Sequence, residues 1–434
     1  MSSLLGSNLP LVKRQNRSLV MRILLHHGPI SRTEICQMTR LTPATISNVI
    51  GGLKESALVV ELGTQQQPDS HRVGRRRLLV DLNTDGLYVI GAYLGITHIR
   101  VGIGNLRGKL LAKTAVPNEG HCSPEYAFSV VYEQVQEVLR RAQVPRERVR
   151  GIGVGSVGLV NSSSGEIVDM PYHGWEHVAA RRDLEGLLGL PVVVDNGRRT
   201  MAIAESSLGL GQDVNSVMLV HVSTTVGGAV VFRREVLEGA NYAAGKLGHL
   251  IVDEDGERCA CGRYGCLDSV ASGAAIVAQA RRAASSGKAN GLLALAGGRV
   301  ESINAETVFR AAEEGDETAA AIVDRSAYYV GVGVAHYVSL FDPEIIILSG
   351  DVALRGGDRY KKQVADVANE RAYRPACRKV ELVYTNFGTD LEVIGPISLA
   401  LQRFVYSADS PALTGGSTRR GILEPLEESE RAIV

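Results

Sequence analysis

One histidine and three cysteines lie close together in the stretch GHLIVDEDGERCACGRYGC, residues 248–266. The whole chain has six cysteines, so half of them fall in this one stretch. Imidazole and thiolate groups ligate zinc, and four of them close a tetrahedron around the ion. We therefore expect a zinc site made by His249, Cys259, Cys261 and Cys266. Free or disulfide-bonded cysteines are the alternative, which a reducing cytosol disfavours.

The spacing of the four residues, H-x9-C-x-C-x4-C, indicates a structural site. Gly262 and Gly265 stand between the last two cysteines and permit the tight turns that the ligands need. The segment has few apolar side chains from which to build a core, so a bound metal would stabilise its fold. Four protein ligands leave no open position for catalysis.

The composition is that of a globular protein with more than one domain. The chain has 434 residues, of which 45% are hydrophobic and 22% are charged. It has no run of eighteen apolar residues and no signal-peptide pattern at its start. We expect a cytoplasmic protein that does not contact a membrane.

The first 82 residues are basic, with eleven Lys or Arg against five Asp or Glu, although the whole chain has 47 of each kind. Such asymmetry suggests a nucleic-acid-binding end. Residues 17–27 have helical spacing and end at a Gly-Pro pair. Ser31 and Glu34 form a capping box that starts a second helix, in which we expect Ile35 and Met38 to face inward.

A third helix follows after a short turn. Thr42 can cap it, and Pro43 suits its first turn. Its exposed N-terminal half is small and polar, as a helix that reads the major groove requires. The residues expected to contact DNA in this helix are Thr42, Pro43, Ala44, Thr45, Ser47 and Asn48.

Residues 57–63 and 76–83 are β-like, and the segment TQQQPDSHRVGR joins them. This pattern predicts the wing of a winged helix-turn-helix. Arginines there can contact phosphates or enter the minor groove, and we expect this of Arg72, Arg75 and Arg76. The alternative is a three-helix protein-interaction module with a solvated basic face.

From residue 87 the pattern becomes α/β and then repeats. Short β-rich runs, a long amphipathic helix and another strand fill residues 87–160, and a similar progression restarts near residue 216. We expect two α/β lobes with a cleft between them. The expected division is 1–82 for the DNA-binding domain and linker, 83–205 with 392–405 for the first lobe, 206–391 for the second, and 406–434 for a disordered tail.

The cysteine string resembles the signature of the ROK family, which comprises bacterial repressors, uncharacterised reading frames and sugar kinases. GRRRLLVDLN, GLGQDVNSVMLVHVSTTVGGAVV, GKLGHLIVDEDGERCACGRYGCLDSVAS and PEIIILSGDV stand in family order, so the resemblance covers nearly the whole chain. It implies an actin-like, sugar-kinase-type domain carrying the zinc knuckle. It also implies that a member with a helix-turn-helix is a sugar-responsive regulator.

The residues that phosphoryl transfer requires differ from the family pattern. In the first phosphate loop, Tyr93 replaces an aspartate and Ile96 a glycine, and the second loop reads STTVGGA. In the segment NGRRTMAIAE, Gly197 falls on the catalytic aspartate. Because glycine cannot accept a proton, we expect no kinase activity. The alternative is an active sugar kinase that recruits Asp195 and keeps a DNA-binding appendage.

The resemblance also implies a sugar-sized effector pocket. Its expected residues are Tyr172, Asn196, Arg199, Lys246, His249 and Asp268. Lys246 and Arg199, with Arg198 as a third candidate, would favour an anion such as a phosphorylated or acidic sugar. The alternative is that Lys246 and Arg199 pair with local acids such as Asp195 or Glu205.

These residues predict a sugar-responsive DNA-binding regulator, expected to be a repressor of carbohydrate genes. Closure of a sugar cleft can alter DNA binding by changing the spacing of two DNA-reading helices. Two such helices require at least two subunits, so we expect the protein to bind operator DNA as a homodimer or homotetramer. An effector-independent DNA-binding protein is a further alternative.

Overall fold

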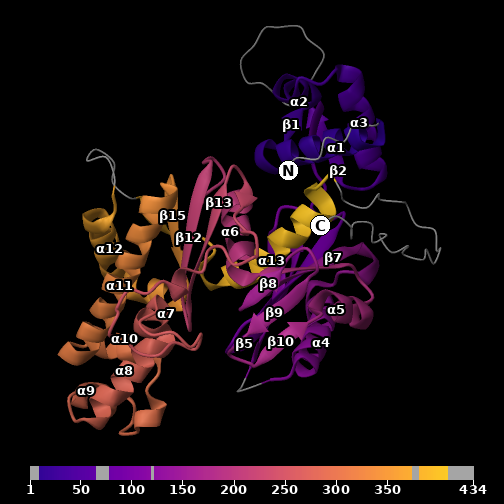
Figure 1. The fold of residues 1–434 in the computed structure, drawn as a ribbon. Helices are drawn as coiled ribbons and strands as arrows, with labels where there is room; N and C mark the ends of the chain where they lie inside the picture. The colour runs from indigo at the N-terminus through magenta and orange to yellow at the C-terminus, as the bar shows by residue number, and fades with distance from the viewer. Residues whose placement is uncertain (1–8, 65–77, 119–121, 374–380, 409–434) are drawn as a thin grey trace, which may run out of the picture. The chain divides into compact units, whose positions relative to one another are not determined.

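The computed structural model describes residues 9–64, 78–118, 122–373 and 381–408 (Figure 1). Within these residues the backbone divides into two compact units, one that ends at Asn83 and one from Thr84 to Ser407. None of the helices in the described ranges has the length and apolar character that crossing a membrane requires.

The first unit combines three helices with a small antiparallel sheet. Its elements in chain order are α1 (Leu9–His27), β1 (Ile30–Ser31), α2 (Arg32–Thr39), α3 (Pro43–Glu55), β2 (Val59–Thr64) and β3 (Leu78–Leu82). The strand order is β1-β3-β2. α1 starts well before residue 17, where its pattern was expected to begin, because only Pro10 opposes a helix there and proline is compatible with a first turn.

Local capping explains where α2 and α3 begin. The Ser31 side chain accepts a hydrogen bond from the Glu34 backbone N–H while the Glu34 carboxylate accepts one from Ser31, which is the predicted capping box. The Thr42 side chain caps α3 by accepting a hydrogen bond from the Thr45 backbone N–H, and Pro43 stands in the first turn. Ile35 is fully buried, but the inward orientation expected of Met38 is wrong, since its side chain is 48% exposed. α2 has only eight residues, and its buried stripe is narrower than the sequence pattern suggested.

The second unit contains two lobes, each built on a five-stranded mixed sheet. The first lobe has the order β11-β7-β4-β5-β6, and the second has β14-β13-β12-β15-β16. In each lobe the first three strands along the chain form an antiparallel meander. The fourth strand pairs in parallel with the first, and the fifth pairs in parallel with the fourth. The two halves therefore share one topology, as the repeated sequence pattern indicated.

The strands of the first lobe are β4 (Tyr88–Leu94), β5 (His98–Asn105), β6 (Leu110–Pro117), β7 (Val149–Ser156) and β11 (Val192–Asn196). A second, three-stranded sheet contains β8 (Leu159–Asn161), β9 (Glu166–Met170) and β10 (Trp175–Val178). The helices are α4 (Pro124–Ala142), α5 (Ala180–Leu188), α6 (Gly197–Leu208) and α13 (Leu391–Leu401). α13 comes from the far end of the chain, packs on β4, β5 and β7, and leads into a helical turn that ends at the buried Tyr406 (Figure 1).

The glycines of the central strands make the close approach of α13 possible. A Cβ on Gly153 would lie 1.9 Å from the Pro396 carbonyl oxygen, and one on Gly91 would lie 2.7 Å from the Val393 oxygen. Only hydrogen at these positions lets the helix backbone rest directly on the strands.

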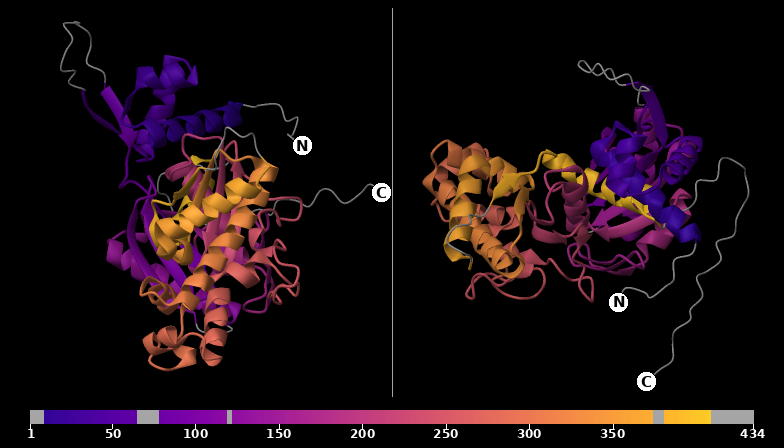
Figure 2. Two further views of the ribbon diagram at one scale, coloured as in Figure 1. Left: turned by 90° about the vertical axis from the view of Figure 1, so that its left-hand side faces the viewer. Right: turned by 90° about the horizontal axis from the view of Figure 1, so that it is seen from above.

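The strands of the second lobe are β12 (Ser216–Val222), β13 (Val226–Phe232), β14 (Glu235–Val236), β15 (Ile345–Ser349) and β16 (Leu382–Tyr384). Its helices are α7 (Leu267–Ala271), α8 (Gly273–Ser285), α9 (Asn290–Leu295), α10 (Ala305–Glu313), α11 (Glu317–Phe341) and α12 (Asp351–Arg371). α11 and α12 lie side by side in both views of Figure 2 and bury apolar side chains against each other.

α6 packs against both lobes. It follows β11 directly, contacts α13 and β7 of the first lobe, and also contacts β12 and β13 of the second. Ten consecutive residues from Gly197 to Ser206 are buried, including Arg198, Arg199 and Glu205. Buried charged groups need partners, so the polar residues of α6 define the centre of the site described next.

We predict that Gly153→Ala weakens the first lobe, because the new methyl group overlaps the Pro396 carbonyl of α13. Overpacking of this kind lowers the free energy of unfolding by about 1–3 kcal/mol. Trp175 is the only tryptophan of the chain and is buried in the same lobe, so its fluorescence during urea denaturation reports the change.

The matched control is Gly186→Ala in α5, where nothing lies within 4 Å of the added Cβ. Alanine favours a helix over glycine by about 1 kcal/mol, so this variant should be as stable as the parent or slightly more stable. Equal midpoints for the Gly153→Ala variant and the parent would show that α13 does not rest on the strand.

Candidate functional site

The four predicted metal ligands come together in the second lobe. His249 ends a 3-10 turn, Cys259 and Cys261 lie in the following loop, and Cys266 immediately precedes α7. Their four ligand atoms all lie within 4.8 Å of one another. The His249 Nδ1 atom is 3.7 Å from the Cys259 sulfur, and the Cys261 and Cys266 sulfurs are 3.6 Å apart. The cluster can hold a metal ion.

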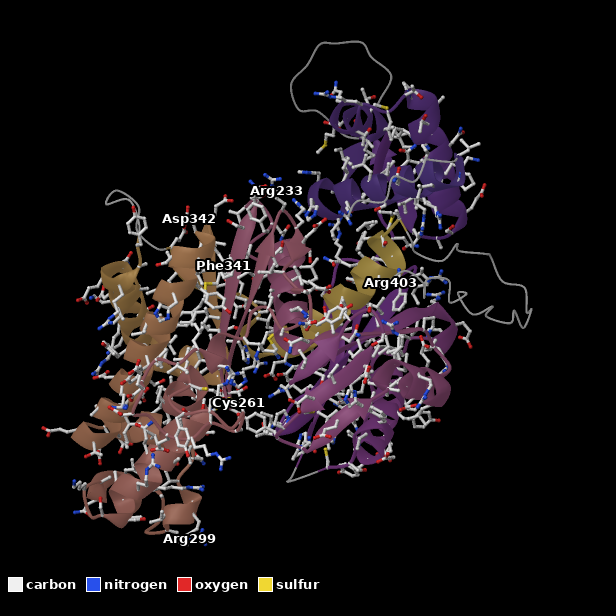
Figure 3. The ribbon with its side chains drawn as sticks, in the orientation of Figure 1. Arg233, Cys261, Arg299, Phe341, Asp342 and Arg403 are labelled. Carbon is white, nitrogen blue, oxygen red and sulfur yellow. The ribbon has the colours of Figure 1, made fainter. Side chains whose placement is uncertain are left out.

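Glycines shape the loop that carries the sulfurs. Gly265 has a φ of +67°, and a Cβ there would lie 1.6 Å from the Asp253 carbonyl oxygen. Short bridges, Ile251 with Cys266 and Arg258 with Tyr264, fold the loop back on itself. Cys261 lies at the margin of the second lobe (Figure 3). It lines a cavity together with first-lobe residues.

This cavity, here called cavity A, lies between the lobes beside the cysteine cluster. All six residues expected to contact an effector line it, namely Tyr172, Asn196, Arg199, Lys246, His249 and Asp268. The structure thus brings together side chains that the sequence separates by up to 96 residues. Phenol, amide and carboxylate groups of this kind can hydrogen-bond the hydroxyls of a sugar.

Several of these side chains already bond to each other or to nearby backbone across the cavity. The Tyr172 hydroxyl donates to Asp268 Oδ2 at 2.7 Å, and Asp268 Oδ1 accepts from the Val226 backbone N–H at 2.6 Å. Asn196 Nδ2 and Lys246 Nζ both donate to the Gly158 carbonyl, at 2.8 and 2.6 Å. Burial and the guanidinium groups of Arg199 and Arg198 lower the pKa of Lys246 to about 8. The surroundings of its ammonium group are therefore electropositive.

Arg199 does not supply a free cation to cavity A, which corrects the role expected of it. Its guanidinium forms an ion pair with Asp195, with Nε 2.6 Å from Oδ1, and also donates to the carbonyls of Tyr242 and Val160. Burial raises the pKa of Asp195 to about 6, which still leaves the carboxylate ionised at neutral pH. Pairing with Asp195, the alternative interpretation, describes this arginine.

A second cavity, cavity B, adjoins cavity A. Its lining includes the first phosphate-loop segment around Ile96, the second loop around Thr225, and Asp351 at the start of α12. Ile96, Val157, Arg198 and Thr225 line both cavities. Arg198 Nη1 donates to the Tyr93 hydroxyl at 2.6 Å, and Nη2 donates to Thr225 Oγ1 at 2.9 Å.

Tyr93 covers the position where the family resemblance puts the catalytic aspartate. A Cβ on Gly197 would lie 2.6 Å from Cε2 of the Tyr93 ring. The aspartate of the first phosphate loop and the catalytic aspartate are thus replaced by two residues that touch each other. The sequence shows each replacement separately, but nothing in it links positions 104 residues apart.

Asp195 is poorly placed to act as a substitute base. It is 3% exposed, its Oδ1 atom binds Arg199 and the Asn196 backbone N–H, and it lines neither cavity A nor cavity B. A general base must reach the proton that it removes. The carboxylates lining the two cavities are Asp268 in cavity A and Asp351 and Glu392 in cavity B.

The residues expected to contact DNA divide into two groups. On α3, Thr42, Pro43, Ala44, Ser47 and Asn48 are exposed, and Thr45 is partly exposed. The Thr42 and Thr45 hydroxyls hydrogen-bond each other at 2.9 Å. Arg72, Arg75 and Arg76 lie outside the described residues, as does the tail from residue 409.

Comparison with known proteins agrees with this architecture. The xylose repressor of Caldicellulosiruptor bescii is 25% identical over 394 residues, covering 91% of this chain and 97% of the relative. The DNA-binding transcriptional dual regulator NagC of Escherichia coli K12 is 28% identical over 345 residues, covering 80% of this chain and 82% of the relative.

Solved structures of both regulators and kinases are similar to the chain. A ROK family transcriptional regulator, a homologue of the Escherichia coli MLC protein, matches 90% of this chain and 97% of its own, with a TM-score of 0.75 and 27% identity. A ROK family glucokinase from Streptomyces griseus, in complex with glucose and AMPPNP, matches 73% of this chain and 99% of its own, with a TM-score of 0.66 and 28% identity. The body therefore has the actin-like fold of ROK sugar kinases.

The ROK family model matches residues 89–403, which is most of the two-lobed unit and well over half of the sequence. The chain belongs to the ROK family.

Proposed function

We propose that this protein is a sugar-responsive DNA-binding transcriptional regulator, acting as a repressor of carbohydrate genes. Its first unit is a winged helix-turn-helix, and its two-lobed body is a sugar sensor without kinase activity. The observation that carries the proposal is the Tyr93 ring packed over Gly197, where a kinase would need a carboxylate. A helix pair suited to DNA, and a sugar-sized cavity with glycine where the family resemblance puts the catalytic aspartate, fit a regulator better than an enzyme.

The first unit supports DNA binding by its geometry. Arg40 takes a left-handed conformation, with φ of 58°, in the three-residue turn between α2 and α3. The exposed first half of α3 then offers small polar side chains, and β2 and β3 pair antiparallel where a wing is expected. This matches the recognition helix and wing of groove-reading proteins. Binding as a dimer would place two such helices on half-sites about one helical turn apart.

The cysteine cluster fits a structural zinc ion. Bond lengths of about 2.3 Å to sulfur and about 2.0 Å to nitrogen make the edges of a tetrahedral site roughly 3.5–3.8 Å long. The distance of 3.6 Å between the Cys261 and Cys266 sulfurs lies in that range, as does the distance of 3.7 Å between the Cys259 sulfur and His249 Nδ1. His249 Nδ1 faces the sulfurs, so a bound zinc would hold the imidazole ring in a fixed orientation at the wall of cavity A.

The effector proposed for cavity A is a sugar or sugar derivative. Tyr172, Asn196 and Asp268 offer hydroxyl-binding groups, while Lys246 adds a cation with no carboxylate within 4.0 Å among the described residues. This excess of positive charge supports an anionic sugar, phosphorylated or acidic, over a neutral one. Effector binding between the lobes would shift the subunit arrangement and thereby DNA affinity.

We predict that Asn48→Ala weakens specific DNA binding. Losing one base-edge contact costs about 1–3 kcal/mol, which is roughly 5- to 150-fold in affinity. The measurement is fluorescence anisotropy with DNA from upstream of the protein's own gene beside a scrambled duplex. Gln37→Ala, at an exposed position of α2, is the control and should bind like the parent. Equal affinity of the Asn48→Ala and parent proteins for both duplexes would argue against α3 as the reading helix.

We predict that Cys261→Ser removes the metal, since a hydroxyl is a much poorer zinc ligand than a thiolate. Loss of a residue that only hydrogen-bonds to a metal ligand typically lowers the affinity for the metal by roughly 10- to 100-fold. Loss of the ligand Cys261 itself should lower the affinity for zinc by more than that. Zinc per chain, measured by plasma mass spectrometry, and effector-driven DNA release should both decrease. Cys36→Ser changes a thiol of the first unit and should retain one zinc per chain. Undiminished zinc in the Cys261→Ser protein would contradict the four-ligand site.

We predict that Gly197→Asp does not create a kinase and instead destabilises the first lobe by about 1–3 kcal/mol, because its Cβ overlaps the Tyr93 ring. Combining Gly197→Asp with Tyr93→Ala should recover part of that loss. The free energies of unfolding of the four proteins in this cycle measure the coupling. Additive losses would show that the ring does not occupy the aspartate's position, and sugar-dependent ATP consumption by the parent protein would overturn the regulator proposal.

A further inference from the structure

We propose that the effector is a sugar phosphate and that Arg198, rather than Arg199, binds its phosphate group. This inference rests on the proposed function and narrows it. The sugar ring would lie in cavity A, and the phosphate would lie at the wall that cavity A shares with cavity B.

Arg198 is a buried cation that no carboxylate of the described residues contacts directly, although the carboxylates of Glu392 and Asp268 lie near enough to interact electrostatically with its charge. It is 8% exposed, and no carboxylate of the described residues lies within 4.0 Å of its guanidinium. Its side-chain partners are the hydroxyls of Tyr93 and Thr225. Burial raises the pKa of Tyr93, so that partner is a neutral phenol and not a phenolate. A buried charge without an ion-pair partner in direct contact is costly, and a bound anion would supply that contact.

Two neighbouring arginines show the contrast. Arg199 is paired with Asp195, and Arg100, which lines cavity B, is paired with Glu392 at 2.7 Å. Both positive charges are therefore already neutralised by the protein. Arg198 lies near both pairs but shares neither carboxylate as an ion-pair partner, so its guanidinium is the one left for a ligand.

The shared wall is the place where a phosphate fits. Arg198 and Thr225 line both cavities, and together they offer a guanidinium and a hydroxyl. Cavity B also contains the carboxylates of Asp351 and Glu392, which would repel a phosphate placed fully inside it. The carboxylate of cavity A is Asp268, whose two oxygens already accept hydrogen bonds from the Tyr172 hydroxyl and the Val226 backbone N–H. The ring is held on the other side by the hydroxyl-binding groups of cavity A.

A phosphate suits this wall better than the carboxylate of an acidic sugar. A phosphate monoester carries close to two negative charges at neutral pH and has three terminal acceptor oxygens. Arg198 and Lys246 are two cations in one cavity, and both lack a carboxylate partner among the described residues. A ring carboxylate has one charge and two oxygens, so it would leave one of these cations without a counterion.

Phosphate binding at this point would also hold the lobes together. Arg198 belongs to α6, which follows β11 of the first lobe, whereas Thr225 lies between β12 and β13 of the second. Their hydrogen bond already crosses the cleft at 2.9 Å. A phosphate that accepts from both side chains would strengthen this link, which gives the effector a means of closing the cleft.

The test is calorimetric titration of the full-length protein with hexose 6-phosphates, hexose 1-phosphates and pentose 5-phosphates, beside their parent sugars, uronates and inorganic phosphate. At least one sugar phosphate should bind about tenfold or more tightly than its parent sugar. Arg198→Met should lower the affinity for that sugar phosphate by about 10- to 100-fold, as expected for a lost charge-assisted hydrogen bond. Its affinity for the parent sugar should stay within about twofold of that of the unmodified protein. The affinity of the Arg198→Lys variant for the sugar phosphate should lie between those of the parent protein and the Arg198→Met variant.

Arg281→Gln is the control, because Arg281 donates to the Ile303 and Glu301 carbonyls and lines neither cavity. It should retain the full preference for the phosphate. Thr225→Val is a second variant, to be used if Arg198→Met lowers the unfolding midpoint followed by Trp175 fluorescence. It should lower the affinity for the sugar phosphate about threefold to tenfold.

The outcomes separate this inference from the regulator proposal. Neutral sugars or uronates that bind as tightly as every phosphate, while still releasing operator DNA, would overturn the phosphate inference and leave the regulator intact. Inorganic phosphate that binds as tightly as the sugar phosphates would also overturn it. DNA binding that no compound alters would contradict the proposed function itself.

Discussion

The first turn of α6 places two adjacent arginines in the buried centre of the molecule, and a buried positive charge must be compensated. Arg199 meets this requirement with Asp195 of β11, four residues earlier, and with two backbone carbonyls. Arg198 meets it only in part, through hydroxyls. The position of the arginines follows from the short step between β11 and α6, because Asn196 ends the strand and caps the helix.

At the start of α6, the position where the family resemblance puts the catalytic aspartate lies beside a buried positive charge. Gly197 leaves no side chain at the start of α6, and the Tyr93 ring fills the space while its hydroxyl accepts a hydrogen bond from Arg198. A site that in a kinase would bring a base and nucleotide phosphates together instead presents a guanidinium. Such a surface favours holding an anion over transferring a phosphoryl group.

The cysteine cluster connects local folding to the cavity. Cys266 caps the start of α7, and Asp268 lies two residues later, where it binds Tyr172 of the first lobe and the Val226 backbone. His249 joins the cluster through Nδ1 and also lines cavity A. A metal held by these residues would therefore set the positions of both His249 and Asp268, which is the kind of support that outer-shell groups give a binding site.

The sequence by itself determined the features that depend on near neighbours: the H-x9-C-x-C-x4-C spacing, the Ser31–Glu34 capping box, the repeated α/β pattern and the missing carboxylate at position 197. The sequence left the Asp195–Arg199 pair as one of two alternatives for Arg199, and the structure has that ion pair. The tertiary structure decided which arginine remains without an ion-pair partner in direct contact and that Tyr93 covers Gly197. Those contacts join strands and helices about a hundred residues apart, and the partner of a buried side chain is set by how such elements pack, not by local spacing.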